Sequence, residues 1–503
     1  MSKRHTMTHR IQPLVFADYW TGEANDMFVT YTWQDWLDAQ DKVQFIETVI
    51  ATYKASREFK HALDAKAYFE GNNTNVLGKY IVKADVQTSV DSRGKRTRSN
   101  RRVQVEGNRL PCGFFRRAVL QENQYILSNG VTLDDPETKA KLGMGFDKAL
   151  EFAGEYALVQ GVSYLFWNSD HVEVIPAATD KASGFVCLLD EMTSEPRIGI
   201  QFWQISAFKP MYVRLFETDG VTIYIRDNKQ MRIAQEKRSY VQTVLHDSLG
   251  EQIIAGENYS ALPVIPLFAN NEKTSELTPS IKRKIDAYDN ISSDFADNLD
   301  RANDVYWVLN NFGGSIQQAL EIMQQINELK IVANQSDGSG SGASAEPRTI
   351  EVPYNARQTA LEILRKEMYL DYMALDMDAM TGGSLTNVAI RAAMANLDLK
   401  ADIYEWQCFQ CVQKILRLLN IETENISFKR QTISNDLETV QAIYMMRSDI
   451  DLRTALELNP YINPDDIETI IANISAEAKT GLPSMDELKQ YLEEEAEQVG
   501  DGE

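Results

Sequence analysis

The spacing of apolar residues changes several times along the chain, and each change marks a different kind of predicted element. Over residues 41–69 the apolar positions recur at helical spacing and stop at Gly71, which predicts one amphipathic helix. From residue 79 to about 265, alternation and short β-branched or aromatic runs predict strands, interrupted by helices over 113–127 and 145–160. This part of the chain is therefore expected to be α+β.

Two amphipathic helices are predicted in the next part of the chain, with a small insert between them. Their apolar stripes fall within residues 280–303 and 355–376. The insert, residues 304–353, has the pattern of a small α/β unit. Its expected parts are a strand over 305–310, a helix over 315–328, a strand in LKIVAN, a flexible Gly/Ser run over 336–345 and a strand over 348–352.

A glycine pair, Gly382 and Gly383, separates the second of these helices from a very long one. Residues 387–419 contain neither Gly nor Pro, so at a rise of about 1.5 Å per residue this helix would reach about 48 Å. The glycine pair fits either a protruding, pliable loop or an ordinary turn between two helices. A strand over 426–430 and shorter helices over 436–479 complete the predicted elements.

The chain is acidic, and its charge narrows the range of functions. Its 503 residues include 51 Lys and Arg against 73 Asp and Glu, which gives a formal net charge of -22. This charge repels phosphates and disfavours a dedicated high-affinity nucleic-acid binder, because tight binding depends on releasing counterions from phosphates. The four cysteines are too few for a disulfide framework, and no apolar stretch reaches the roughly 18 residues of a membrane span. We therefore expect a soluble protein of a reducing compartment, with no membrane partner.

Motifs of common enzymes do not occur in the sequence. There is no Walker A loop, no HExxH and no GxSxG, and the five histidines are scattered. Carboxylate pairs such as Asp294/Asp297 and Asp398/Asp402 would suit a two-metal nuclease, but 73 acidic residues also produce such pairs by chance. The sequence therefore predicts no catalytic residues, no metal site and no cofactor.

Two other clusters each allow a structural and a functional interpretation. Cys408 and Cys411 have the spacing of metal ligands, but they lie among apolar residues of the long predicted helix, which favours core packing. Residues 93–117 contain nine basic residues against Glu106 alone. This run could contact phosphates or an acidic neighbour, whereas a solvated hairpin or a contact between subunits is the interpretation that we favour.

Six segments of the chain have a recognisable sequence. They are AYFEGNNTN (67–75), NRLPCGFFRRAVLQENQYILSNGVTL (108–133), LPVIPLFANNE (262–272), IDAYDNISSDFADNLDRANDVYWVLNNFGG (285–314), TGGSLTNVAIRAAMANLDLKAD (381–402) and FKRQTISND (428–436). Together with the order of the predicted elements, these segments resemble the portal proteins of tailed bacteriophages, specifically those of the siphophage type. The resemblance covers about residues 67–436 and is most specific over 262–402.

The resemblance implies an α+β portal fold assembled as a ring. The implied regions are a β-rich wing (1–279), two stem helices (280–303 and 354–376), an α/β clip between them (304–353), a tunnel loop (377–387), a long wing helix with its strand (388–435), and a helical crown with an acidic tail (436–503).

The resemblance also implies a role in DNA packaging. About twelve copies would form the ring at the procapsid vertex through which the genome is packaged and later ejected. The implied partners are further copies of the chain, the terminase motor, the major capsid and scaffolding proteins, the head-completion adaptor and the double-stranded DNA in the tunnel. The chain would belong to the virion, and to the host cytoplasm during assembly.

The resemblance assigns two groups of residues to this role. The loop facing the DNA would consist of Thr381, Gly382, Gly383, Ser384, Leu385, Thr386 and Asn387. The stem residues in contact with neighbouring copies would be Ile285, Tyr288, Phe295, Leu299, Leu364 and Met368.

Two other classes of protein stay open on the sequence alone. A phage-encoded metal-dependent nuclease or other enzyme would use the acidic pairs, and a structural scaffold without a channel would need neither pairs nor tunnel. Both alternatives predict monomers or small dimers, whereas the portal interpretation predicts rings.

Overall fold

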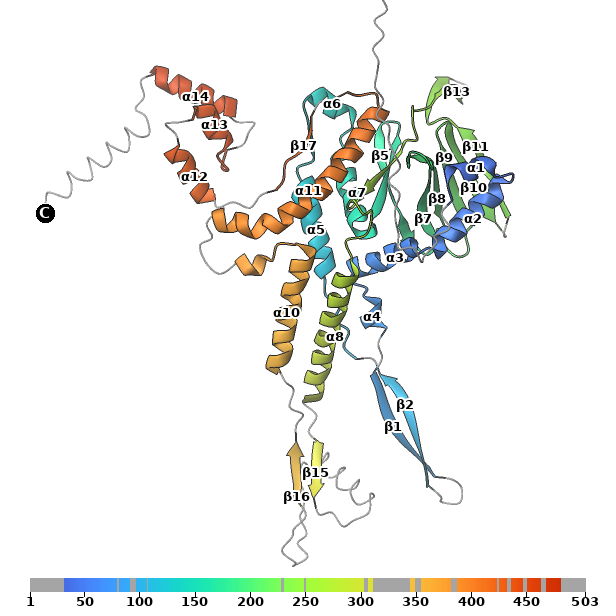
Figure 1. Ribbon diagram of the computed structural model, residues 1–503, viewed down its shortest axis with the longest axis vertical. Coiled ribbons are helices and arrows are strands. Elements are labelled where there is room, and N and C mark those ends of the chain that lie inside the picture. The colour runs from blue at the N-terminus through green and yellow to red at the C-terminus, as the bar shows by residue number, and fades with distance from the viewer. Residues whose placement is uncertain are drawn as a thin grey trace, which may run out of the picture. The chain divides into compact units, whose positions relative to one another are not determined.

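The computed structural model describes residues 31–78, 81–90, 96–105, 107–227, 230–247, 250–302, 306–310, 344–348, 354–380, 387–422, 425–431, 436–446, 450–462 and 467–480. Helices and strands both occur in it, which confirms the α+β class (Figure 1). The chain divides into two compact units, which are described separately. Unit 1 consists of Met1–Ala374 and Leu399–Gln431, and unit 2 of Leu375–Asp398 and Thr432–Glu503.

Four short helices begin the described part of unit 1. They are α1 (Trp33–Asp38), α2 (Lys42–Ala55), α3 (Arg57–Phe69) and α4 (Thr74–Leu77). The prediction of one helix over 41–69 is wrong, because the helix breaks at Ser56. Ser56 has an extended backbone, with ψ of 160°, and its Oγ accepts a hydrogen bond from the backbone N–H of Phe59. A serine in this geometry caps the following helix, so α3 starts as a separate helix after Ser56.

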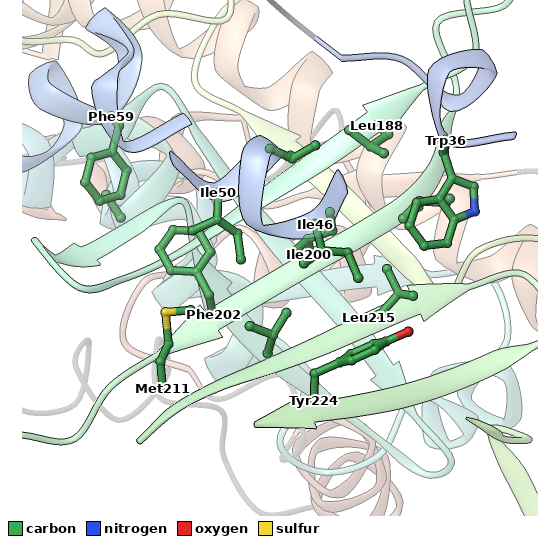
Figure 2. Packing of buried hydrophobic residues seen from close by; sticks show 14 of the residues in the cluster. Trp36, Ile46, Ile50, Phe59, Leu188, Ile200, Phe202, Met211, Leu215 and Tyr224 are labelled. Atoms are coloured by element: carbon green, nitrogen blue, oxygen red, sulfur yellow. The ribbon is translucent and has the colours of Figure 1, made fainter. Parts of the chain in front are cut away.

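The largest sheet of unit 1 has six antiparallel strands in the order β11-β10-β9-β8-β7-β6. These strands are β6 (Ala178–Asp180), β7 (Ser183–Leu189), β8 (Pro196–Trp203), β9 (Met211–Glu217), β10 (Gly220–Asp227) and β11 (Gln230–Arg238). Alternation along β8 and β9 directs Ile200 and Leu215 to one face, where they meet Trp36, Ile46 and Ile50 of the N-terminal helices (Figure 2). This face is the first core of unit 1.

The opposite face of the six-stranded sheet is buried as well. It packs against a three-stranded sheet in the order β14-β4-β5, formed by β4 (Val162–Asn168), β5 (His171–Pro176) and β14 (Val264–Phe268). Phe185 and Phe216 of the large sheet contact Tyr164 and Phe166 of β4 through aromatic pairs. The β-rich part is therefore layered, with apolar side chains on both faces of its central sheet.

Three further strand pairs belong to unit 1. They are β1 (Ile81–Val90) with β2 (Arg96–Val105), β12 (Val241–Asp247) with β13 (Gly250–Glu257), and β3 (Val131–Leu133) with β17 (Ile426–Phe428). The β1–β2 hairpin carries much of the basic run, and its register sets Asp85 opposite Arg101. The hairpin predicted there is confirmed, whereas its role stays a prediction.

Helices α5 (Phe114–Leu127) and α7 (Phe146–Gln160) match the helices predicted over 113–127 and 145–160. The sequence reasoning missed α6 (Pro136–Lys141) between them. Its signal was present: Asp135 accepts the first backbone N–H groups, and Pro136 occupies the first turn, where its missing N–H costs nothing.

Two long helices, α8 (Pro279–Ala302) and α10 (Tyr354–Tyr372), lie side by side in unit 1 (Figure 1). The first agrees with its prediction, and the second ends four residues before the predicted 376. Between them, β15 (Tyr306–Asn310) pairs antiparallel with β16 (Ser344–Arg348). The flexible run predicted over 336–345 is wrong at its last two residues, because a strand begins at Ser344. The predicted strand over 348–352 is described only at Arg348, which lies in β16. The rest of that strand, the strand predicted in LKIVAN and the helix predicted over 315–328 lie outside the described residues.

The long helix is α11 (Asn387–Leu418), as predicted over 387–419. A short 3-10 helix, Met377–Met380, precedes it in the chain. Unit 2 also contains α12 (Asp436–Met445), α13 (Leu452–Glu457) and α14 (Ile467–Thr480), in agreement with the short helices predicted over 436–479. Among the helices described, none combines the length and the apolar character that a membrane span requires.

Candidate functional site

A row of polar side chains on α8 holds a neighbouring backbone segment by its N–H groups. Three side chains at intervals of four residues each accept one backbone hydrogen bond. The pairs are Cys112 N–H to Asp289 Oδ1 at 2.8 Å, Leu110 N–H to Ser293 Oγ at 3.1 Å, and Asn108 N–H to Asp297 Oδ1 at 2.7 Å. We call this row and the segment 108–112 the α8 seam.

The spacing of the α8 seam follows from the geometry of helix and chain. Four residues of an α-helix rise by about 6.0 Å, and two residues of an extended chain advance by about 6.6 Å. Donors two residues apart on the segment 108–112 therefore meet acceptors four residues apart on α8 when the two run antiparallel. The observed order, with Cys112 on Asp289 and Asn108 on Asp297, is antiparallel.

The α8 seam continues toward α3 and α4 through a cluster of amides and carboxylates. Asn73 donates from Nδ2 to Asp289 Oδ2 at 2.8 Å and to Asp286 Oδ1 at 3.1 Å. Asp286 also accepts the Tyr68 hydroxyl and, at 2.8 Å, the Asn75 side chain. Burial raises the pKa of Asp289, while the hydrogen bonds from Asn73 and Cys112 lower it. Such buried carboxylates are tolerated because their oxygens are occupied by donors.

Three of the six recognisable segments meet at the α8 seam. Residues 67–75 supply Tyr68, Asn73 and Asn75, residues 108–133 supply the backbone donors, and residues 285–314 supply the acceptors on α8. The pattern of these segments therefore has a physical basis, since residues 67–75 and 108–112 both form their hydrogen bonds to carboxylates and a hydroxyl of α8.

A second polar cluster lies where α10 and α11 meet α5 in unit 1. Lys400 Nζ lies 3.1 Å from Glu122 Oε2 and 2.7 Å from Glu276 Oε2, and it donates to the backbone oxygen of Tyr372 at 3.1 Å. The Tyr372 hydroxyl donates to Glu122 Oε2 at 2.8 Å. The Lys400 ammonium also lies 3.3 Å from the centre of the Tyr372 ring. These four residues form the Lys400 cluster.

Burial governs the charge state of the Lys400 cluster. Glu122 is 1% exposed, and this desolvation raises its pKa to about 7, although Lys400 lowers the pKa and Glu276 raises it. Lys400 was missed by the sequence reasoning. A signal existed, because Lys400 falls on the same helical stripe as Tyr404 and Cys411, which are buried.

One member of each carboxylate pair considered as metal ligands is engaged with another group of the chain. Asp297 accepts the Asn108 N–H, and Asp402 forms an ion pair with Arg430. Within the described ranges, no cluster of three or more His, Cys, Asp or Glu side chains is arranged to hold a metal ion. Cys408 and Cys411 are free and buried, which agrees with the core packing that we favoured.

The predicted stem residues have very different surroundings. Ile285 and Met368 are each 2% exposed, so both side chains pack almost wholly within the single chain. Tyr288, Leu364 and Phe295 are half-buried, the last against the ring of Tyr354 at 5.8 Å. Leu299 is 40% exposed. Contact with a neighbouring copy stays a prediction for all six.

The predicted tunnel loop lies almost wholly outside the described residues. These residues are Thr381, Gly382, Gly383, Ser384, Leu385 and Thr386. Asn387 begins α11, and its Nδ2 donates to Thr439 Oγ1 of the same unit at 3.3 Å. The side chain of Asn387 is thus occupied within unit 2, and the role of the loop stays a prediction.

Two curated relatives are similar to parts of this chain. The portal protein of Clostridium phage phiCD119 is 25% identical over 225 residues, which cover 43% of this chain and 49% of that protein. The portal protein of Bacillus phage SPP1 is 27% identical over 264 residues, which cover 49% of this chain and 48% of that protein. The chain thus spans about half the length of the curated relatives that it matches.

A family model also matches the chain, over residues 212–501, and its description is "Phage portal protein, SPP1 Gp6-like". The matched range includes α8, α10 and α11, and with them the acceptors of the α8 seam and Lys400. It confirms the resemblance drawn from the six segments. Because the match extends over more than half of the residues, the chain belongs to the phage portal protein family, SPP1 Gp6-like.

Proposed function

We propose that this chain is the subunit of the portal ring at the DNA-entry vertex of a phage procapsid. The observation that carries the proposal is the family match over residues 212–501. In this role about twelve copies surround a tunnel through which the genome enters during packaging and leaves during ejection.

Exposed apolar side chains on the α8–α10 pair support assembly into a ring. Ile363 is 58% exposed and Leu370 is 50% exposed, and their separation of seven residues sets them on one face of α10. Leu299 on α8 adds further apolar surface. Apolar surface of this kind is usually covered in an assembly, and contacts between unlike faces of successive copies close into a ring.

Ion pairs support the proposal that α8 and α10 act together as the stem. Lys284 of α8 lies 3.1 Å from Glu367 Oε2 and 2.7 Å from Asp371 Oδ2 of α10. The Ser280 hydroxyl donates to Asp371 at 2.7 Å. These bonds join the two helices near one end, so the pair would present its apolar faces to neighbouring copies as one body.

The other regions follow from the same proposal. Residues 1–279 form the wing, residues 304–353 the clip that meets the terminase motor and later the head-completion adaptor, and residues 436–503 the crown. The loop over 377–387 faces the DNA, and the capsid and scaffolding proteins contact the outside of the ring. The net charge of -22 supports this role, because a passage for a polyanion should not hold phosphates. No catalytic step is proposed.

Electron microscopy of the purified chain tests the proposal. The wild type should give rings with a central hole, and the double variant Ile363→Asp/Leu370→Asp should give monomers or irregular aggregates. The matched control is Met144→Asp/Phe208→Asp, which sets the same two charges at exposed apolar positions outside α8 and α10 and should leave the rings intact.

Two results would count against the proposal in different ways. Rings from the α10 double variant would reject α10 as a ring contact. Monomers or small dimers from the wild type would favour an enzyme or a scaffold without a channel.

A further inference from the structure

We propose that Lys400 and Arg430 are positioning residues, which hold to α5 and α11 the three points where the chain passes between its two compact units. The inference rests on the proposed function, because one of the segments held in this way, residues 375–398, contains the proposed tunnel loop. Neither side chain needs to touch DNA, since each acts through the backbone that it fixes.

The division of the chain defines the three crossing points. The chain leaves unit 1 after Ala374, returns to it at Leu399, and leaves it again after Gln431. Unit 2 is therefore connected to unit 1 by three separate covalent links. Whatever fixes these links in unit 1 also fixes the ends of residues 375–398 and the start of residues 432–503.

Each crossing point has an anchor within two residues, and all the anchors bond to one turn of α5. Tyr372 and Lys400 both bond to the carboxylate of Glu122. The backbone N–H of Gln431 donates to the carbonyl oxygen of Tyr125 at 2.8 Å. Glu122 and Tyr125 are three residues apart, so the three anchors share one side of α5.

The contacts of Lys400 match the donors of a lysine. Its ammonium group has three N–H bonds, and it has three oxygen partners, from Glu122, Glu276 and the backbone of Tyr372. The Tyr372 carbonyl lies at the C-terminal end of α10, where helix carbonyls lack partners within the helix and favour a cation. A lysine that served only to neutralise two carboxylates would not need this backbone bond.

Arg430 secures the third crossing through two carboxylates of α11. Its guanidinium bonds to Glu405 through Nε at 2.8 Å and pairs with Asp402 through Nη2. Both carboxylates are on α11, directly after Lys400. A planar guanidinium that spans two carboxylates has a defined orientation, so the backbone at Gln431 is held against both α11 and α5.

Hydrogen–deuterium exchange on the full-length chain tests the inference. In Lys400→Met, peptides covering 373–380 and 387–399 should exchange at least tenfold faster, while peptides from β8 to β10 keep their wild-type rates. Lys237→Met is the matched control, because Lys237 also pairs with two carboxylates, Glu217 at 2.7 Å and Asp219 at 2.9 Å, but lies on β11. It should leave residues 373–399 unchanged.

A triple variant separates positioning from the neutralisation of charge. Lys400→Met alone leaves Glu122 and Glu276 close together without their cation, which destabilises the fold. In Lys400→Met/Glu122→Gln/Glu276→Gln no charge is stranded, so the melting temperature should recover while exchange at 373–399 stays fast. Recovery of slow exchange in the triple variant would overturn the positioning role, as would equal acceleration in β8 to β10 or no acceleration in Lys400→Met.

If Lys400→Met does not fold, Glu276→Gln removes the charge of one partner only and should raise exchange at 373–399 by a smaller factor. Unchanged exchange there would overturn the inference.

DNA packaging supplies a second readout: procapsids with Lys400→Met rings should package less DNA than those with Lys237→Met rings, and equal packaging would contradict the inference. Failure of the wild type to form rings would contradict the proposed function instead, and the exchange measurements would still decide the role of Lys400.

Discussion

Replacement of Asp289 by alanine should loosen the α8 seam more than any other single change on α8. Asp289 is fully buried, and its two oxygens accept from the Cys112 N–H and from Asn73 Nδ2, each at 2.8 Å. The Asn73 side chain keeps a second acceptor, Asp286, at 3.1 Å. The Cys112 N–H loses the acceptor that holds it to α8, and this loss sets the size of the effect.

The size of the effect follows from the free-energy cost of a buried N–H that has lost its hydrogen-bond acceptor. Leaving a buried N–H without its partner costs about 1–3 kcal/mol, and we take about 2 kcal/mol because Cys112 is half-buried. At 1.36 kcal/mol per factor of ten, the amide of Cys112 should exchange about thirtyfold faster in Asp289→Ala. The amides of Asn108 and Leu110 should accelerate less, because Asp297 and Ser293 still hold them.

The Cys112 thiol gives an independent readout. Burial, together with the charge of Asp289, raises the pKa of this thiol to about 12, so it is almost wholly protonated at pH 8. Without Asp289 the pKa should fall and iodoacetamide should label Cys112 faster. Asp294→Ala is the control, because it removes an exposed carboxylate from the same helix. Equal exchange and equal labelling in the two variants would refute the reasoning.

Two further predictions concern Glu122 and Gly161. Burial raises the pKa of Glu122 to about 7, beside Lys400, Glu276 and Tyr372. An unfolded glutamate has a pKa of about 4.3, so the native state binds the carboxyl proton of Glu122 more tightly than the unfolded state does. Stability should therefore fall as pH rises from about 4 to 7, by at most about 3 kcal/mol, and denaturation of Glu122→Gln should lack this slope; an unchanged slope would contradict the assignment. Gly161 ends α7 at φ of 90°, and a Cβ added there would lie 2.9 Å from the backbone nitrogen of Ser275. Gly161→Ala should therefore reduce the free energy of unfolding by about 1–3 kcal/mol and lower the melting temperature. An unchanged melting temperature would refute this prediction.

Elements with a long, uninterrupted stripe could be predicted well from the sequence. The apolar stripe over 280–303 predicted α8 to within one residue at each end, and the absence of Gly and Pro over 387–419 predicted α11 equally closely. Predictions failed where a local side-chain bond overrode the period. The Ser56 hydroxyl accepts a hydrogen bond from a backbone N–H in the first turn of α3, so the apolar stripe over 41–69 is divided between two helices.

The α8 seam and the Lys400 cluster could not be predicted in the same way. Their partners lie far apart in the sequence: 177 residues separate Cys112 from Asp289, and 250 residues separate Glu122 from Tyr372. Periodicity reports which side of a helix is apolar, but it carries no information about which distant backbone N–H a buried aspartate will meet. The resemblance to a family identified the segments of sequence that form the α8 seam, but only the fold shows which of their residues are in contact.

The α8 seam also has a mechanical consequence. Its three backbone hydrogen bonds lie in a row along the helix, so a force along the axis of α8 loads them in parallel, in shear. A peeling force at one end would break them one after another, at a much lower load. A motor that pushes DNA along a channel exerts its reaction force along the channel axis. If α8 runs along that axis, the reaction force loads the three hydrogen bonds of the α8 seam in shear, where they are strongest. Only a force perpendicular to α8 would break them one after another.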